Sequence, residues 1–121
     1  MMFHYFLLIK KTKVLLVEKY DISHKILNEL ANLESRHILF AIMKSPKSIK
    51  DISRKQKIPL SSVYKRIESL KECSLIHEKV DFAKNGRITR YYQSKIKDIE
   101  VIITKFEPKI MFTKNRLMKN D

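Results

Sequence analysis

The chain has 121 residues and a mass of 14.5 kDa, a length that fits one domain better than two. Lys and Arg number 26 against 13 Asp and Glu, a formal net charge of +13. Apolar residues make up 44%, which argues against a disordered basic tail, and one Gly with three Pro excludes a collagen-like or linker-dominated chain. The single cysteine, Cys73, excludes a disulfide scaffold and suits a reducing compartment, so we expect a cytoplasmic protein.

Residues 1–20 form an apolar and basic N-terminal extension. Its opening run, residues 1–9, falls short of the ~20 apolar residues that a membrane span needs. The run has no basic residue before it and no small-residue cleavage site after it, so it makes a poor signal peptide. We interpret the extension as strands or a helix covering the core or a partner subunit, so no membrane is expected. Attachment to a membrane surface is the alternative.

The positive charge is concentrated in two windows of the sequence. Residues 44–66 hold eight basic residues against Asp51 alone, a net charge of +7, and residues 84–97 hold five basic residues and no acid. The other 84 residues together carry only +1. One charged run is usually a solvated face, but two segregated runs on a balanced chain favour a site for a polyanion.

Apolar residues recur at helical spacing between residues 21 and 76. The first helix starts near residue 21, with Asp21 or Ser23 as its N-cap, and the second runs from near Asn32 to the Ser45-Pro46 stop. Their expected core positions are Ile22, Ile26, Leu27, Leu30, Ala31, Ile38, Leu39, Ile42 and Met43.

The third helix begins with a capping box. Ser48 is its N-cap, and Asp51 stands at the third helical position, where a carboxylate can reach back to the amide of the cap. Ile49 and Ile52 are expected to point inward.

A fourth helix, about residues 61–72, follows a short break and has Ser61 and Ser62 as its candidate caps. Its apolar face holds Val63, Ile67 and Leu70, which are expected in the core, and the opposite face is small and basic near the N-terminus. Two short helices with a short break are typical of a helix-turn-helix. An ordinary helical bundle would explain the apolar stripe equally well, but not the basic face.

The segments after the fourth helix are rich in β-branched and aromatic residues and flank Lys84-Asn85-Gly86; they are residues 75–82 and 87–94. Asn-Gly is a strong hairpin signal, because both residues tolerate positive φ. A three-residue loop would place Phe82 opposite Ile88 as a buried pair. A two-residue loop would instead pair Ala83 with Ile88.

Residues 97–121 form a C-terminal β extension and basic tail. Residues 99–103 read as a strand, with Glu107 and Pro108 as a turn before a further strand. A dimerising helix is the competing interpretation, against which Pro108 and the β-branched run weigh. The predicted fold is therefore α+β, a winged helix-turn-helix over residues 21–96 with a three- to four-helix core, a β-hairpin wing and extra N- and C-terminal elements.

Three segments carry a resemblance to known regulators. LANLESRHIL (residues 30–39) resembles the second-helix signature of ArsR-like proteins, and IPLSSVYKRIESL (residues 58–70) resembles the recognition helix of ArsR- and MarR-type winged helices. The lysine-rich style, with YYQSKI (residues 91–96) closing the wing, looks archaeal. The resemblance covers about residues 22–96 and implies a winged-helix transcriptional regulator, without specifying its target.

The chain departs from that family in its glycines and its cysteine. Family members often have Gly where this chain has Lys57 and Ser74, and a left-handed non-Gly residue costs ~1–2 kcal/mol. Metal-sensing members carry clustered ligands, whereas this chain has Cys73 alone and dispersed histidines, so no metal or other cofactor is expected. With Gly86 as its only glycine the chain has no phosphate-cradling loop, and nothing marks a catalytic base, so we expect no enzyme.

We therefore predict a sequence-specific regulator that binds double-stranded DNA. The helix at residues 61–72 would enter the major groove, the start of the third helix would anchor phosphates, and the wing at residues 84–90 would reach the adjacent backbone or minor groove. Glu68 would repel phosphate unless it accepts from a cytosine amine or pairs with Lys65 or Lys71. The predicted DNA-binding residues are Ser48, Lys50, Ser61, Ser62, Tyr64, Lys65, Arg66, Ser69, Lys84, Arg87 and Arg90.

Two other functions stay open at this point. The chain could be a winged-helix protein-interaction subunit of a basal transcription or replication assembly, docked through its apolar N-terminal extension. RNA binding by the same basic face is less favoured, because most of the aromatic residues look structural. Since residues 3–17 and 99–112 are more apolar than the surface of a monomer needs, we also expect a homodimer that buries one or both.

Overall fold

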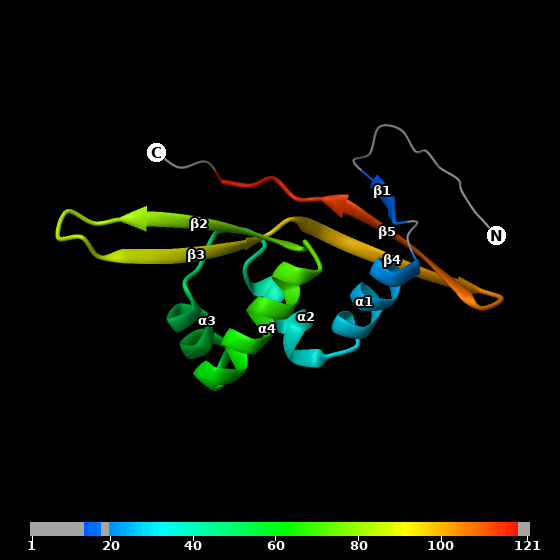
Figure 1. The fold of residues 1–121 in the computed structure, drawn as a ribbon, viewed down its shortest axis with the longest axis horizontal. Helices are drawn as coiled ribbons and strands as arrows, with labels where there is room; N and C mark the ends of the chain where they lie inside the picture. The colour runs from blue at the N-terminus through cyan, green and yellow to red at the C-terminus, as the bar shows by residue number, and fades with distance from the viewer. Residues whose placement is uncertain (1–13, 18–19, 119–121) are drawn as a thin grey trace.

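The computed structural model describes residues 14–17 and 20–118 as an α+β arrangement of helices and two antiparallel sheets (Figure 1). In chain order the elements are β1 Val14–Val17, α1 Tyr20–Leu30, α2 Leu33–Ala41, α3 Ile49–Gln56, α4 Leu60–Glu72, β2 Ile76–Phe82, β3 Ile88–Ser94, β4 Ile96–Thr104 and β5 Glu107–Lys114. The predicted roles of residues 1–13 lie outside the described residues. Within the described ranges, no helix is long and apolar enough to span a membrane.

The strands form two hairpins that extend in opposite directions along one side of the helices (Figure 1). One sheet is the β2-β3 hairpin, and the other has the order β1-β5-β4. Only Lys95 separates β3 from β4, so the hairpins share one long ribbon. This arrangement of helices and a hairpin is compatible with a winged helix.

The core lies where α2, α3 and α4 meet the start of the strands. Ile52 of α3 and Val63, Ile67 and Leu70 of α4 are fully buried, as the helical spacing predicted. Ile96 and Ile110 belong to the same apolar cluster, so the C-terminal strands complete this core. Each such side chain contributes about 1.5–3 kcal/mol on burial.

Two of the expected core positions in the first two helices are wrong. Ile22 and Ala31 are exposed, although Ile26 and Leu30 on the same helix are buried. The buried stripe of α1 is therefore narrower than its apolar composition indicated, because this short helix meets the rest of the protein along one side.

The helix starts confirm the predicted cap at Ser48, add one at Asn32, where the second helix was expected to begin, and correct the cap of the first helix. Asn32 Oδ1 accepts a hydrogen bond from the Ser35 amide at 3.0 Å, and Ser48 Oγ accepts one from the Asp51 amide at 3.2 Å. The first helix, however, begins at Tyr20, so Asp21 and Ser23 lie inside it and neither is its N-cap.

Two further details of the helices differ from the sequence prediction. α2 ends at Ala41, several residues before Pro46, and the chain then reaches β3, where Lys47 N–H donates to Tyr92 O at 3.0 Å and Tyr92 N–H donates back at 2.9 Å. The Asp51 carboxylate does not complete a capping box but binds Arg54 at 2.7 Å.

The break before α4 is made by a left-handed residue and a proline. Lys57 has φ 57° and ψ 44°, and Ser74 after α4 has φ 59°, so both positions where glycine was expected are left-handed. α4 starts at Leu60 with Pro59 as its N-cap, because the Pro59 carbonyl accepts from the Val63 amide at 3.0 Å. The prediction that Ser61 and Ser62 cap this helix is wrong.

The β2-β3 hairpin, which was predicted as the wing and is given that name below, has the three-residue loop, with Phe82 opposite Ile88. Ala83 N–H donates to Arg87 O at 2.8 Å, and Gly86 has φ 85°. Phe82 and Ile88 are nevertheless 72% and 53% exposed, so the prediction of a buried pair is wrong. The register is right, but the hairpin extends beyond the helices that could have covered this pair (Figure 1).

The C-terminal extension is a hairpin, which excludes the dimerising helix for this region. β4 pairs with β5, and β5 pairs with β1 through Leu15 opposite Phe112. The turn lies at Lys105, which has φ 64°, and Phe106. Pro108 is inside β5 opposite Ile103, so the turn predicted at Glu107 and Pro108 is wrong by two residues.

Candidate nucleic-acid interface

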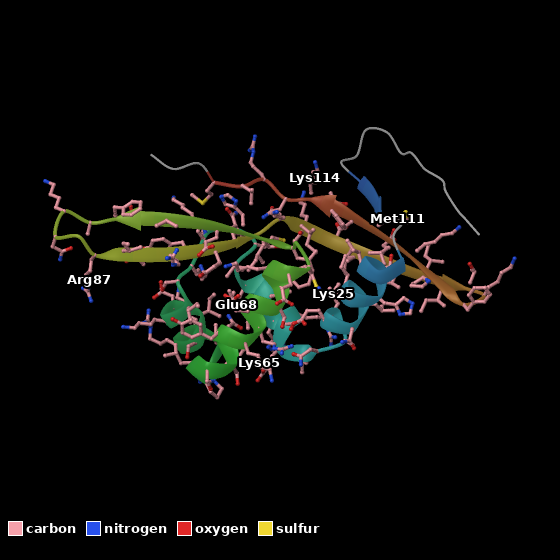
Figure 2. The ribbon with its side chains drawn as sticks, viewed as in Figure 1. Lys25, Lys65, Glu68, Arg87, Met111 and Lys114 are labelled. Carbon is pink, nitrogen blue, oxygen red and sulfur yellow. The ribbon has the colours of Figure 1, made fainter. Side chains whose placement is uncertain are left out.

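The exposed face of α4 carries short polar, aromatic and basic side chains near its N-terminus. Ser61, Tyr64 and Lys65 are exposed, and Ser62 and Ser69 are half-buried. In Figure 2, Lys65 projects from α4 on the side away from the two hairpins. The helix therefore presents side chains that can donate and accept hydrogen bonds on a face that its own core does not use.

The first turn of α4 also leaves its backbone amides without a side-chain cap. Pro59 offers no capping side chain, and the first turn holds no acidic residue. The N-terminal amides of a helix and its macrodipole favour an anion there. α3 differs, because Ser48 already accepts from one amide and Asp51 lies in the first turn. Of the two helix starts, α4 is the better place for a phosphate or a base edge.

Arg66 does not belong to this surface, which corrects the sequence prediction. Its Nη1 lies 2.9 Å from Glu29 Oε2 of α1, and the two side chains are only 15% and 11% exposed. The same carboxylate oxygen accepts from the hydroxyl of the fully buried Ser35 on α2. Arg66 is therefore a structural residue that ties α4 to α1 and α2.

A groove of about 730 Å³ separates the start of α3 and the side of α4 from the wing. Its walls combine cations and aromatic rings with two carboxylates: Ser48, Ile49, Lys50, Tyr64, Glu68, Lys71, Glu78, Arg87, Ile88, Thr89, Arg90 and Tyr92. The structure thus gathers residues of both basic sequence windows around one cleft, together with several of the predicted contact residues.

Glu78 connects the two sides of this groove. Its carboxylate lies 3.3 Å from Lys71 Nζ of α4 and 3.5 Å from Arg90 Nη1 of β3, and it accepts from the Tyr92 hydroxyl at 3.2 Å. Burial acts to raise the pKa of Glu78, but Lys71, Tyr92 and Arg90 outweigh it and leave that pKa below its usual value. Burial and the Glu78 charge raise the pKa of Tyr92 to about 12.

This network changes the assignment of three charged residues. Arg90 is engaged by Glu78 and therefore fixes the wing as well as contributing charge. Glu68 lies 3.7 Å from Lys71 Nζ, which is one of the pairings that the sequence offered for it. Lys71 itself was missed as a groove residue, although helical spacing from Glu68 indicated that the two could meet.

Lys84 and Arg87 lie at the tip of the wing, and both are exposed. Arg87 projects from the wing on the side of the helices (Figure 2), and it also lines the groove. Its amide donates to Asn85 Oδ1 at 3.0 Å, which fixes the loop while leaving the guanidinium available. The wing tip can therefore contact a polyanion lying along α4.

Sequence reasoning missed Glu78 and Tyr92, which are opposite each other in the β2-β3 register. The three-residue loop that sets Phe82 opposite Ile88 also sets Glu78 opposite Tyr92, so the sequence already contained the signal for this pair. Within the described ranges, no group of three or more His, Cys, Asp or Glu side chains could hold a metal ion. Cys73 is buried, and burial raises the pKa of its thiol.

The comparisons with known proteins identify no family for this chain. No protein-family model matches the sequence, and no curated protein matches it significantly.

Proposed function

We propose that this protein is a winged helix-turn-helix transcriptional regulator that binds double-stranded DNA in a sequence-specific manner. The observation that carries the proposal is the uncapped start of α4. It bears exposed Ser61, Tyr64 and Lys65 beside a groove whose far wall is a basic wing. A helix with this face fits the width of a major groove, where hydroxyl and ammonium groups can read base edges.

The contact residues divide into two groups. Ser61, Ser62, Tyr64, Lys65 and Ser69 of α4 are the candidates for base edges. Phosphates would be bound by the cations at the start of α3 and at the wing tip, which are Lys50, Lys84 and Arg87. Ser48 acts as a helix cap, and Arg66 supports α4 from inside.

Charge compensation within the groove also supports this assignment. Two carboxylates, Glu68 and Glu78, line a surface that would face phosphates. Lys71 lies within 4 Å of both, so their charges are partly neutralised inside the protein. Lys50, Lys84 and Arg87 form none of the ion pairs found among the described residues, so their charge is available to an external anion.

The first experiment is selection of bound duplexes from a random library, followed by titration of the selected site and a scrambled site at one salt concentration. Lys65→Ala should remove ~1–3 kcal/mol of binding to the selected site and less from the scrambled one. Thermal stability should change by less than ~0.5 kcal/mol, as for a surface site.

Lys25→Ala is the matched control, because it removes the same charge from α1, away from the wing (Figure 2). It should affect both duplexes weakly and equally. An equal loss of binding to both duplexes for Lys65→Ala would make Lys65 a phosphate contact. No loss of binding to either duplex would refute insertion of α4 into the major groove of DNA.

A protein-interaction subunit is the second candidate, favoured by the exposed apolar residues of the β4-β5 hairpin. The two functions differ in the isolated protein. A regulator binds a selected short duplex alone with clear preference over a scrambled one, whereas a subunit of this kind binds duplexes weakly and without preference.

A further inference from the structure

β4 presents an open sheet edge that the DNA-binding proposal does not use. It spans nine residues, Ile96–Thr104, and it is the outer strand of the β1-β5-β4 sheet. Among the described residues, its only strand partner is β5. The strand at the other edge, β1, has four residues. Unpaired N–H and C=O groups along a strand form a template for another strand.

Lys97, Asp98 and Glu100 lie in the first half of this edge, but its second half is apolar where a solvent-facing edge is usually charged. Val101, Ile102 and Ile103 are 38%, 44% and 59% exposed, and Phe106 in the turn is 81% exposed. Edge strands are normally protected by Lys, Pro or a bulge at their centre. The bulge of β4 lies near its start, between Ile96 and Asp98, and leaves residues 99–104 regularly paired with β5 on one side.

We propose that β4 pairs antiparallel with β4 of a second copy of this chain, which joins the two sheets into one of six strands. The free backbone groups of β4 require an extended strand as partner, and the side chains of β4 indicate which strand that is. The same apolar run read in the opposite direction matches itself across a two-fold axis, so a second copy supplies both the hydrogen bonds and the side-chain match.

The register follows from charge and from the alternation of faces. Residues opposite each other share a face, so a two-fold axis perpendicular to the sheet passes through a residue. An axis at Glu100 sets two carboxylates opposite each other. An axis at Ile102 divides its apolar pairs between the two faces, with Ile102 opposite itself on one face and Val101 opposite Ile103 on the other. An axis at Val101 places three apolar pairs on a single face, with Val101 opposite itself and Ile99 opposite Ile103, and sets Glu100 opposite Ile102 on the other face.

Those three pairs extend an existing apolar surface. Within each copy, Val101 is opposite Ile110 and Ile99 is opposite Phe112 on β5. Ile110 is fully buried in the core, and Ile99 and Phe112 pack against it. The dimer therefore continues the core-facing side of the sheet across the axis. A single strand pair is smaller than a standard interface, so we expect micromolar association rather than an obligate dimer.

Cysteine cross-linking of the full-length chain tests both the partner and the register. Val101→Cys should form a disulfide-linked dimer of twice the 14.5 kDa chain mass under mild oxidation, because its Cβ faces its own copy. Ile103→Cys is the matched control on the same face: it is more exposed, but lies four residues out of register with its copy. It should cross-link only when mixed with the Ile99→Cys variant.

The native chain provides the background, because its only cysteine is buried. Equal cross-linking of Val101→Cys and Ile103→Cys would indicate random collision and overturn the proposal. Absence of cross-linking in folded Val101→Cys at high micromolar concentration would also overturn it.

Sedimentation of unmodified protein supplies the second measurement. The native chain should show a monomer-dimer equilibrium, Val101→Lys should shift it at least tenfold toward monomer, and Ile88→Lys on the wing hairpin should leave it unchanged. A dimer that persists in Val101→Lys would place the interface elsewhere and refute pairing through β4. These outcomes are independent of DNA binding.

Discussion

The buried contact between Arg66 and Glu29 gives the sharpest test of the structure, because the sequence placed Arg66 on the DNA surface. Arg66→Met keeps a long apolar side chain but removes the guanidinium. The change leaves the Glu29 carboxylate with the Ser35 hydroxyl and without its 2.9 Å cation. Breaking a buried ion pair on one side costs about 3–5 kcal/mol. With side chains 15% and 11% exposed, we expect the lower end, about 3 kcal/mol.

Urea unfolding followed by far-UV circular dichroism at neutral pH measures this loss. Lys65→Met is the matched control, because it makes the same substitution at the adjacent, exposed position of α4 and should cost less than about 0.5 kcal/mol. Adding Glu29→Leu to Arg66→Met should recover much of the loss, because the double variant no longer buries a lone carboxylate.

The two assignments of Arg66 predict opposite results. A structural Arg66 gives a large loss of stability, with the affinity of the remaining folded protein for DNA little changed. A loss of stability below about 1 kcal/mol, together with weakened duplex binding, would refute the buried pair and restore Arg66 to the DNA surface.

Three further changes test the wing, the groove and the turn before α4. Lys84→Ala with Arg87→Ala should weaken all duplexes about equally and reduce the slope of log K against log salt by about 0.9 for each lost phosphate contact; an unchanged slope would show that the wing does not touch DNA. The pKa of Glu78 is lowered in the folded protein, so its stabilising contribution is present above the ordinary value of 4.5 and is lost as pH falls through the folded pKa. Acid unfolding should therefore show a smaller pH dependence below 4.5 for Glu78→Gln than for the native chain, and identical profiles would contradict the network. Lys57→Gly should stabilise the protein by up to about 1 kcal/mol in thermal unfolding, since Lys57 has φ 57°; destabilisation would mean that the lysine side chain supports the turn.

Local chemistry predicted most of the fold of this protein. The α4 stripe of Val63, Ile67 and Leu70 depends only on a helical repeat, and the cap at Ser48 depends on atoms within three residues. The left-handed conformations of Lys57 and Ser74 were implied by the resemblance to regulators that often have Gly at these positions. Such features need no knowledge of how distant elements pack.

The errors concern residues whose environment is set by distant parts of the chain. Helical angle placed Arg66 on the flank of α4, but only the packing of α1 brings Glu29 beside it, 37 positions earlier in the sequence. Strand pairing predicted Phe82 opposite Ile88, but their burial depended on whether a helix reaches the wing tip. Periodicity reports which face a side chain occupies, and the tertiary arrangement decides what covers that face.

The tertiary arrangement also places a carboxylate, Glu78, among the cations that line the groove. Lys71 of α4 and Arg90 of β3 would repel each other if no carboxylate lay between them. Glu78 prevents this by accepting from Lys71 on one wall and from Arg90 and Tyr92 on the other. Its single negative charge costs some attraction for phosphate, but it fixes the spacing between α4 and the wing. Binding of a rigid polyanion depends on that fixed spacing as well as on net charge, because a preorganised site orders fewer side chains on association. The carboxylate in the groove is therefore consistent with a DNA-binding surface.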